Sequence, residues 1–377
     1  MNRRLVFAAI AAAASVPWVL PARWHAAERT APVDSRPTAA DTATSAPHLG
    51  FTLPPWPQQE AILANIRARF DASPSVGLAV HYVRLRDVVG HDDPRIEQAD
   101  RILRGFATEC APIVATRSGA RYREHEHKVR PTAAEESHVG QALAVLAEIG
   151  VGSDAEILVG RETQRLADVV ADLVANYYPR RFDVEWTAVA LATYWPTDRW
   201  TNRFDESSSF DSLASELMER EPFRQSCGGT HLLQALACIL LRKADSLQPA
   251  TAQRARAYIS AALDAREDSD RTRLHITWQD GVPRLRRDRG PSLLVTGHLV
   301  EFLLTSSAAF GGTRQPTRES ITWLQSELMR YSASIVPEKD ICEVTHAFRA
   351  VSLARTLCGH VDCATGNMGD TSVRAHG

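Results

Sequence analysis

From about residue 56 onward, the hydrophobic and polar positions define two alternating kinds of helical segment. The first kind has apolar residues at three- and four-residue spacing with charges between them, which is typical of helices with one buried face. These amphipathic segments are Gln58–Phe70, Pro94–Ala107, Arg161–Tyr178, Phe210–Glu219, Thr251–Glu267 and Arg318–Ser332. The second kind is apolar nearly all round, which indicates burial on most sides. These apolar segments are Val76–Val88, Ser137–Gly150, Val184–Tyr194, Thr230–Leu241, Gly297–Thr305 and Val344–Leu357.

The apolar segments also resemble one another. Five of them contain a histidine followed, three residues later, by a polar or charged residue, and the sixth keeps the apolar pattern with Trp186 in the histidine position. The pairs are His81 with Arg84, His138 with Gln141, His231 with Gln234, His298 with Glu301, and His346 with Arg349. Most of these positions recur at intervals of 40 to 50 residues, a period that is typical of helical repeats.

Two further segments match each other and predict β-hairpins. Thr116–Arg123 and Thr277–Arg284 carry Ser-Gly and Asp-Gly turn residues between short β-prone stretches. Each lies about twenty residues before a repeated histidine, His138 or His298. Such insertions would account for the two longest repeat intervals.

The alternation predicts an all-α fold, in which about six helical hairpins close into an α/α toroid decorated by two small β-hairpins. An open solenoid also stacks helix pairs, but it usually lacks a wholly apolar inner layer. The pattern resembles the α/α-toroid superfold of terpenoid cyclases, protein prenyltransferase β subunits and (α/α)6 glycan-processing barrels. This resemblance covers roughly residues 56–357 and implies the fold alone. The chain has no Asp-x-Asp-Asp run, no Gln-Trp repeats and no recognisable Asp…Cys…His zinc pattern.

The N-terminal region has a different character. Arg3 and Arg4 precede an apolar stretch, Leu5–Leu20, which predicts a signal peptide or short membrane anchor over residues 1–22. A buried N-terminal helix is the alternative. Residues 23–55 are mostly small and polar and predict a disordered tether, while residues 358–377 form a C-terminal tail. We therefore expect export, to the periplasm or outside the cell, with membrane attachment only through an uncleaved N-terminal segment.

Charge and composition narrow the partners. The 377 residues carry a net charge of -2, and no nucleic-acid-binding motif is present, so we expect no nucleic-acid partner. Aromatic residues make up only 7% of the chain, which argues against an aromatic-lined lumen for terpenoids. No cofactor is indicated.

The repeated histidines are the candidate functional residues. Positions three and four apart share a helix face, so each histidine points the same way as its polar partner. His138, His231, His298 and His346 follow Ser137, Thr230, Gly297 and Thr345, which suit helix N-caps. In a closed ring, these starts would form a polar crown at one mouth, where the positive helix ends favour an anionic group. The alternative is a repeated packing device without a ligand.

If the crown is catalytic, His298 and Glu301 are the candidates for acid and base, because histidine titrates near neutrality and an apolar lumen raises a glutamate pKa. His138, Gln141, His231, Gln234, His346 and Arg349 are then candidate ligand-binding residues. Asp198, Asp205 and Glu206 are possible further carboxylates, in a loop that otherwise forms a solvated connection. The ligand would be a small polar or anionic molecule or a glycan.

The six cysteines raise three further interpretations. Cys227 with His231, and Cys342 with His346, have the four-residue spacing that places both groups on one helix face. Together they form a Cys2His2 set suited to zinc, although we expect the two pairs to face each other across the mouth. A Cys227–Cys342 disulfide or separate structural cysteines are the other interpretations, and Cys358 with Cys363 is the nearest local pair.

Three functions remain open at this point: an enzyme or small-ligand binder that uses the mouth, a non-catalytic protein-interaction scaffold, and a terpenoid- or prenyl-handling protein. Whether the chain is an enzyme stays uncertain. Convergence of the four histidines on an open cavity would favour the first function, and a plugged mouth the second.

Overall fold

The computed structural model describes residues 49–105, 112–116, 119–122, 138–179, 183–222, 225–271, 275–279, 282–286, 293–306, 309 and 314–359. Contacts divide the chain into residues 1–45 and residues 46–377, and everything described belongs to the second unit. The predicted signal segment, nearly all of the tether and the tail beyond Gly359 lie outside the described residues. No helix among the described residues is both long enough and apolar enough to cross a membrane.

The described chain is mostly helical, as the periodicity predicts. The amphipathic helices are α1 (Gln59–Ala72), α4 (Pro94–Leu103), α6 (Leu166–Ala175), α8 (Phe210–Met218), α10 (Pro249–Arg271) and α12 (Arg318–Leu328). The apolar helices are α2 (Val76–Tyr82, continued by a 3-10 turn at Val83–Leu85 and by α3, Arg86–Val89), α5 (Gln141–Glu148), α7 (Val184–Tyr194), α9 (Thr230–Arg242), α11 (Leu293–Ser306) and α13 (Ile341–Gly359).

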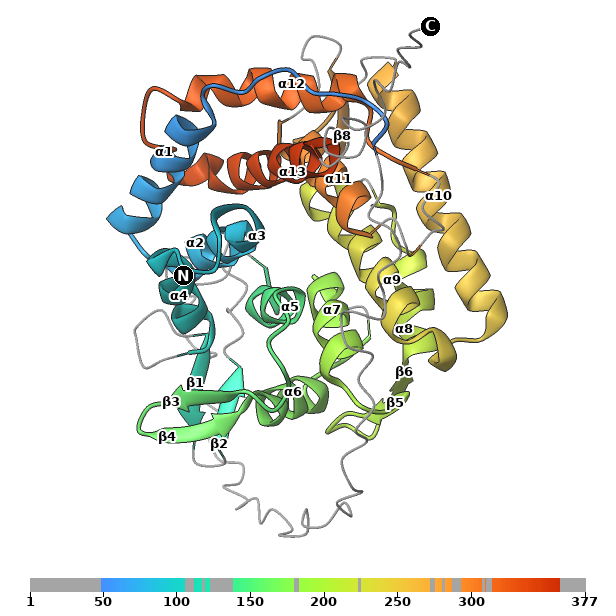
Figure 1. The fold of residues 1–377 in the computed structure, drawn as a ribbon. Coiled ribbons are helices and arrows are strands. Elements are labelled where there is room, and N and C mark those ends of the chain that lie inside the picture. The colour runs from blue at the N-terminus through green and yellow to red at the C-terminus, as the bar shows by residue number, and fades with distance from the viewer. Residues whose placement is uncertain are drawn as a thin grey trace, which may run out of the picture. The chain divides into compact units, whose positions relative to one another are not determined.

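Each apolar helix contacts the next one along the chain, and the last contacts the first. The contacts run from α2 to α5, α7, α9, α11 and α13, and from α13 back to α2 (Figure 1). The amphipathic helices pack against them, with α6 on α7, α8 on α9 and α12 on α13. This arrangement explains why the apolar helices need hydrophobic residues on nearly every side: they have neighbours both along the series and behind it.

The first described helix is joined to the last ones by specific contacts. Asn65 of α1 donates a hydrogen bond to the carbonyl of Tyr331 over 2.9 Å, and Arg69 donates to that of Val336 over 2.7 Å. The rings of Trp56 and Phe348 lie 5.2 Å apart. Segments almost 300 residues apart in the chain therefore share one hydrophobic core.

Among the described residues, four β-hairpins accompany the helices. Both predicted hairpins are present, as β1–β2 (Ile113–Thr116 with Gly119–Tyr122) and β7–β8 (His275–Gln279 with Val282–Arg286). Two others were not predicted, namely β3–β4 (Glu156–Val159 with Glu162–Arg165) and β5–β6 (Arg199–Thr201 with Ser207–Ser209).

The predicted helix at Arg161–Tyr178 is therefore wrong over its first turn. Residues 162–165 form β4, and the helix begins only at Leu166. Ile157 and Val159 of β3 are buried and alternate with exposed residues, as in a half-buried strand. Gly160, with a φ of +67°, turns the chain, and the polar residues that follow pair with β3 as β4. The helical periodicity is confined to Leu166–Ala175 and does not continue into the residues before it.

The predicted N-caps are wrong at all four histidines, and at three of them the helix also begins well away from the predicted residue. The helix α11 begins at Leu293, so Gly297 and His298 lie inside it, and α13 begins at Ile341, so Thr345 and His346 lie in its second turn. The Thr345 hydroxyl bonds back to the carbonyl of Ile341. Helix α5 begins after His138, because Gly140 takes a left-handed conformation at its N-cap. In a helix that is apolar on all sides, polar and apolar positions do not alternate, so the sequence pattern does not show where the helix begins.

At α9 the start is close to the prediction, but the cap differs. Thr230 is the first helical residue, and the N-cap is Gly229, with a φ of +82°. A Cβ at this position would lie 2.0 Å from the carbonyl oxygen of Pro222, so only glycine fits.

Candidate functional site

The repeated histidine position brings five imidazoles and Trp186 into one continuous series of ring contacts. The ring centroids lie 5.7 Å apart for His138 and Trp186, 4.1 Å for Trp186 and His231, and 5.0 Å for His231 and His298. The series continues through His346 at 3.7 Å from His298 and ends at His81, 5.4 Å from His346. We call these five histidines, together with Cys227 and Cys342, the histidine cluster.

Four of these imidazoles have Nδ1 held by a hydrogen-bond acceptor. Nδ1 lies 3.2 Å from the Asp183 carboxylate in His138, 3.3 Å from the Gln234 amide oxygen in His231 and 2.7 Å from the Leu294 carbonyl in His298. In His346 it bonds the carboxylate of Glu301. These oxygens accept hydrogen bonds, so neutral rings carry the proton on Nδ1 and keep a lone pair on Nε2.

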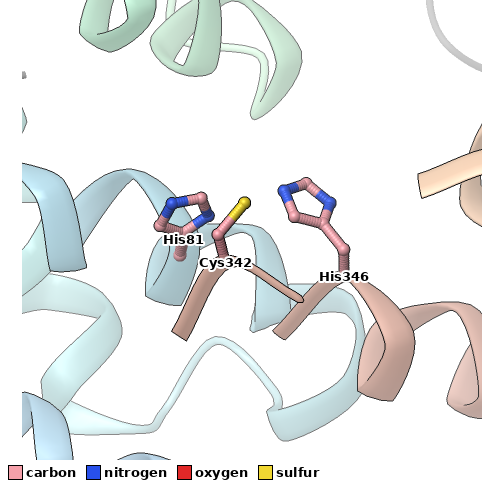
Figure 2. A group of neighbouring side chains, drawn as sticks. All are labelled: His81, Cys342 and His346. Carbon is pink, nitrogen blue, oxygen red and sulfur yellow. The ribbon is translucent and has the colours of Figure 1, made fainter. Parts of the chain in front are cut away.

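Both cysteines of the candidate zinc pairs belong to the cluster. The thiols of Cys227 and Cys342 are close enough for each to shift the pKa of the other, and the Cys342 sulfur lies 3.7 Å from Nε2 of His298. Figure 2 shows the Cys342 thiol between the rings of His81 and His346. The expectation that the two cysteine–histidine pairs face each other across a mouth is therefore wrong. The rings of His231 and His346, one from each pair, lie only 6.2 Å apart.

Cys227 of the cluster and its neighbour Asp183 have unusual backbone conformations. Cys227 has a φ of +51° and Asp183 a φ of +53°, in the left-handed region that non-glycine residues rarely occupy. Cys227 is followed by Gly228 and Gly229, both with positive φ, immediately before α9. The chain thus makes a sharp turn that places the Cys227 thiol at the start of that helix.

The cluster contains groups with opposite pKa shifts. The hydrogen bond from Cys342 lowers the pKa of Cys227 well below its usual value, against the effect of burial, and it raises that of Cys342 well above. Burial alone would lower the pKa of His138, but hydrogen bonds to Asp183 and Cys227 raise it to about 10. Burial and the neighbouring His298 lower the pKa of His346 to about 3. These shifts favour a thiolate at Cys227 and an imidazolium at His138.

A cavity of about 210 Å³ adjoins the cluster. His231, His298 and His346 border it, together with the side chains of Gln234, Glu301 and Arg349, all of them candidates from the sequence. Arg84, Glu148 and Arg242 also line it and were not among those candidates. Arg84 follows His81 in the same three-residue pattern as the other pairs, so the repeat contained the signal for it. Glu148 and Arg242 lie at helix ends, where the pattern carries no information.

Ion pairs tie most of the charged lining together. Arg84 donates through Nε to Glu148 over 2.7 Å, and Arg349 donates to Glu301 and, over 2.9 Å, to Asp87. The Arg84 guanidinium lies 5.4 Å from the ring centre of Trp186. Its Nη1 and Nη2 atoms are buried and have no hydrogen-bond partner among the described residues. Arg84 is thus a buried cation with four of its five N–H donors unused among the described residues.

The environment of Glu301 differs from the expectation. Burial does favour a raised pKa, but the neighbouring His346, which is hydrogen-bonded to the carboxylate, and the charge of Arg349 outweigh it and lower the pKa of Glu301 well below its usual value. Glu301 is therefore ionised and paired near neutral pH. This direction of the pKa shift argues against Glu301 as the proton donor of a reaction, while its role as a base stays a prediction.

Some candidates lie apart from the cavity. Gln141 is buried but does not line it. Asp198 bonds Ser246, and Glu206 bonds Asn202 within the loop before β6, so these carboxylates serve local structure. Trp200 in the same loop is buried against Tyr177 and Phe210. Most other residues of the loop are exposed, so it is the solvated connection that the sequence offered as the alternative, with Trp200 packed beneath it.

Comparisons with protein-family models, with curated proteins and with solved structures give no match for this chain. The proposals that follow rest on the residues and geometry described above.

Proposed function

We propose that this protein is an α/α toroid that binds a small anionic ligand in its lumen. The toroid is supported by the cyclic series of contacts through α2, α5, α7, α9, α11 and α13, with amphipathic helices packed behind it. The cavity is lined by residues from each of these helices or their continuations, as expected for a space at the centre of such a ring.

The unused guanidinium donors of Arg84 carry the ligand proposal. A buried polar group without a partner costs about 1–3 kcal/mol, and more when it is charged. Two parallel N–H groups match the two oxygens of a carboxylate or phosphate group. An anion in the cavity would therefore recover this cost, and Arg349 and Arg242 would add positive charge beside it.

The size of the cavity favours a small ligand. At about 210 Å³, it is below the roughly 300–1,000 Å³ typical of sites for drug-sized molecules. A carboxylate- or phosphate-bearing metabolite fits this space better than a glycan chain. The lining is mainly polar, with Phe302 as its one carbocyclic aromatic ring among the described residues, so no observation favours a terpenoid ligand.

Export to the periplasm or beyond remains part of this proposal, on the strength of the N-terminal sequence pattern. Acid–base roles for His298 and Glu301 are compatible with the site, because both border the cavity. The alternative of an interaction scaffold depends on whether the tail covers the mouth, and the tail after Gly359 lies outside the described residues.

Thermal-shift and calorimetric titration with inorganic phosphate, citrate and succinate test the anion proposal. We expect at least one of these anions to stabilise the protein in proportion to RT ln(1 + [L]/Kd). In Arg84→Gln we expect its affinity to fall by roughly tenfold or more, because one charged hydrogen-bonding group is lost. Arg84→Lys keeps the charge without the planar fork and should be intermediate.

The matched control is Arg104→Gln, which removes an arginine paired with Asp100 on α4, away from the cavity. Chloride at equal ionic strength controls for general salt effects. Equal stabilisation by the anions in wild type, Arg84→Gln and Arg104→Gln would show that they act on the protein surface, and the proposal would be wrong.

A further inference from the structure

We propose that the histidine cluster holds one zinc-class divalent ion, with Cys227, Cys342 and His298 as obligatory ligands. His298 lies close to both thiols. The Cys342 sulfur is 3.7 Å from its Nε2, and donor atoms of Cys227 and His298 lie within 4.8 Å of each other. The two thiols are also close enough for each to shift the pKa of the other. Thiolate and imidazole together are the donor set that zinc and related ions prefer.

The surrounding imidazoles supply the fourth ligand. His231 forms a three-membered group with Cys227 and His298, in which all donor atoms lie within 4.8 Å of one another. His81 and His346 form a second such group with Cys342 (Figure 2). Nδ1 of His81 and Nε2 of His346 are buried without a hydrogen-bond partner among the described residues. Two orphaned nitrogens beside a thiol indicate that a cation belongs between them.

Groups outside the ligands orient the rings as metal sites require. Metal-binding histidines usually give one N–H to a carboxylate or carbonyl, so that the other nitrogen presents its lone pair. Here the Leu294 carbonyl holds Nδ1 of His298, the Gln234 amide oxygen holds that of His231, and Glu301 holds that of His346. The tautomers are therefore set before any ion arrives.

The backbone at Cys227 gives separate support. A φ of +51° at a non-glycine residue costs roughly 1–3 kcal/mol, and such strain concentrates where a side chain must be placed for a function. Here the strained residue presents its thiol to Cys342. The turn through Gly228 and Gly229 brings Cys227 from the α8–α9 connection toward a cysteine of α13.

Charge balance favours one ion over two. Two thiolates neutralise one divalent cation, whereas a second ion would add positive charge close to Arg84 and Arg349, which line the adjoining cavity. The site also differs from the Cys2His2 set expected from sequence spacing. In that set His346 accompanied His231, whereas in the structure His298 is the imidazole that contacts both thiols.

The same cluster also contains a competing arrangement. Cys227 bonds His138, whose Nδ1 lies 3.2 Å from Asp183, as in a thiol nucleophile with its base and orienting carboxylate. A nucleophile needs only one cysteine, and this arrangement leaves Cys342, the orphaned nitrogen of His346 and that of His81 without a role. The metal centre accounts for all of them.

Metal analysis and cobalt substitution of the full-length protein, purified under reducing conditions, test the proposal. We expect one equivalent of zinc per chain. Cobalt(II) added to the metal-depleted protein should give tetrahedral d–d bands and a thiolate-to-cobalt charge-transfer band with the intensity of two thiolates. This spectrum of the wild-type protein is informative even if a variant fails to fold.

Cys227→Ser, Cys342→Ser and His298→Ala should each weaken cobalt binding by more than the roughly 10- to 100-fold typical of changes outside the ligand set. Cys238→Ser is the matched control, because its thiol lies on α9 next to Thr193, and it should leave binding unchanged. The readouts require no anion, so they are independent of the ligand-binding test.

Three results would overturn the metal site as stated. The first is wild-type protein without stoichiometric metal, either with a Cys227–Cys342 disulfide or with a Cys227 thiol that iodoacetamide modifies rapidly, which would favour the nucleophile. The second is undiminished binding in both serine variants. The third is two equivalents of tightly bound ion per chain.

Discussion

At the scale of single residues, buried charges with several partners recur in this protein, and Asp93 shows the energetic logic away from the cavity. Its carboxylate accepts hydrogen bonds from Arg67 over 3.0 Å, from the Tyr82 hydroxyl over 3.1 Å and from the backbone N–H of Arg95 over 3.0 Å. Burial would raise the pKa of Asp93, but these bonds outweigh it and lower that pKa. Asp93 also caps α4, so it joins three elements through one side chain.

We expect Asp93→Asn to lower the free energy of unfolding at pH 7 by about 1–3 kcal/mol, because asparagine keeps the helix cap but loses the charge. The folded pKa of Asp93 is depressed, so its stabilisation is present above the unfolded pKa and is lost as the pH falls through the folded pKa. Urea denaturation at pH 7 and pH 3 should therefore show a smaller difference at pH 3. Asp92→Asn, at an exposed position, is the control. A difference independent of pH would contradict this account.

At the scale of elements, the repeated apolar helices explain both the success and the limits of the sequence-based expectations. All six apolar and all six amphipathic segments are helical over most of their predicted length. Their first residues were predicted less well, because Leu293 and Ile341 extend α11 and α13 backward with residues no different from those inside. The histidines consequently sit within two helices and not at their N-termini, so helix-end charge contributes little at His298 and His346.

The packing of α11 on α13 depends on Gly297. A Cβ there would lie 2.9 Å from the backbone nitrogen of Ala347 and 3.0 Å from its Cα atom. In an open helix, alanine would be about 1 kcal/mol more favourable than glycine. Here we expect Gly297→Ala to destabilise the protein by about 1–3 kcal/mol, because the two backbones must move apart.

Chemical denaturation shows whether Gly297→Ala lowers or raises the free energy of unfolding. Ser326→Ala, on the exposed side of α12, is the control and should change it little. Metal binding should weaken in Gly297→Ala as well, since the shift separates His298 from Cys342. Stabilisation by the alanine would mean that α11 and α13 are not in close contact in solution.

At the scale of the whole molecule, the contact between the beginning and the end of the described chain is the feature that a closed ring requires and an open array lacks. It includes the Trp56–Phe348 ring pair, the bond from Arg355 to the carbonyl of Pro54, and the Arg349–Asp87 ion pair. In an open solenoid, repeats contact only their neighbours, so the first and last would be energetically independent.

A double-mutant cycle on Trp56→Leu and Phe348→Leu measures this contact. We expect a coupling energy of about 0.5–1.5 kcal/mol, the range for aromatic pairs beyond their burial. Trp56→Leu combined with Phe210→Leu is the control, because Phe210 packs on Trp200 in a different part of the core, and its coupling should be near zero. The same near-zero value for Trp56 with Phe348 would be evidence against closure.

The sequence by itself determined the helical class, the alternation of apolar and amphipathic helices, two of the hairpins and the repeated histidine position. These follow from local periodicity, which a single chain segment carries without reference to the others. It also placed His231, His298, Glu301 and Arg349 together as candidates, because a shared place in a repeat predicts a shared place in the fold.

Only the tertiary structure decided what those residues contact. It brought Cys227 close to Cys342 and set Arg349 and His346 beside Glu301, whose pKa they lower. It also left most donors of the buried Arg84 without a partner among the described residues. All of these features arise between segments that are distant in the chain. Such contacts depend on how closely helices pack and on where each one begins, and neither quantity is set by the residues of one helix alone. A pattern of residues thus indicated which side chains meet, while distance and burial decided their chemistry.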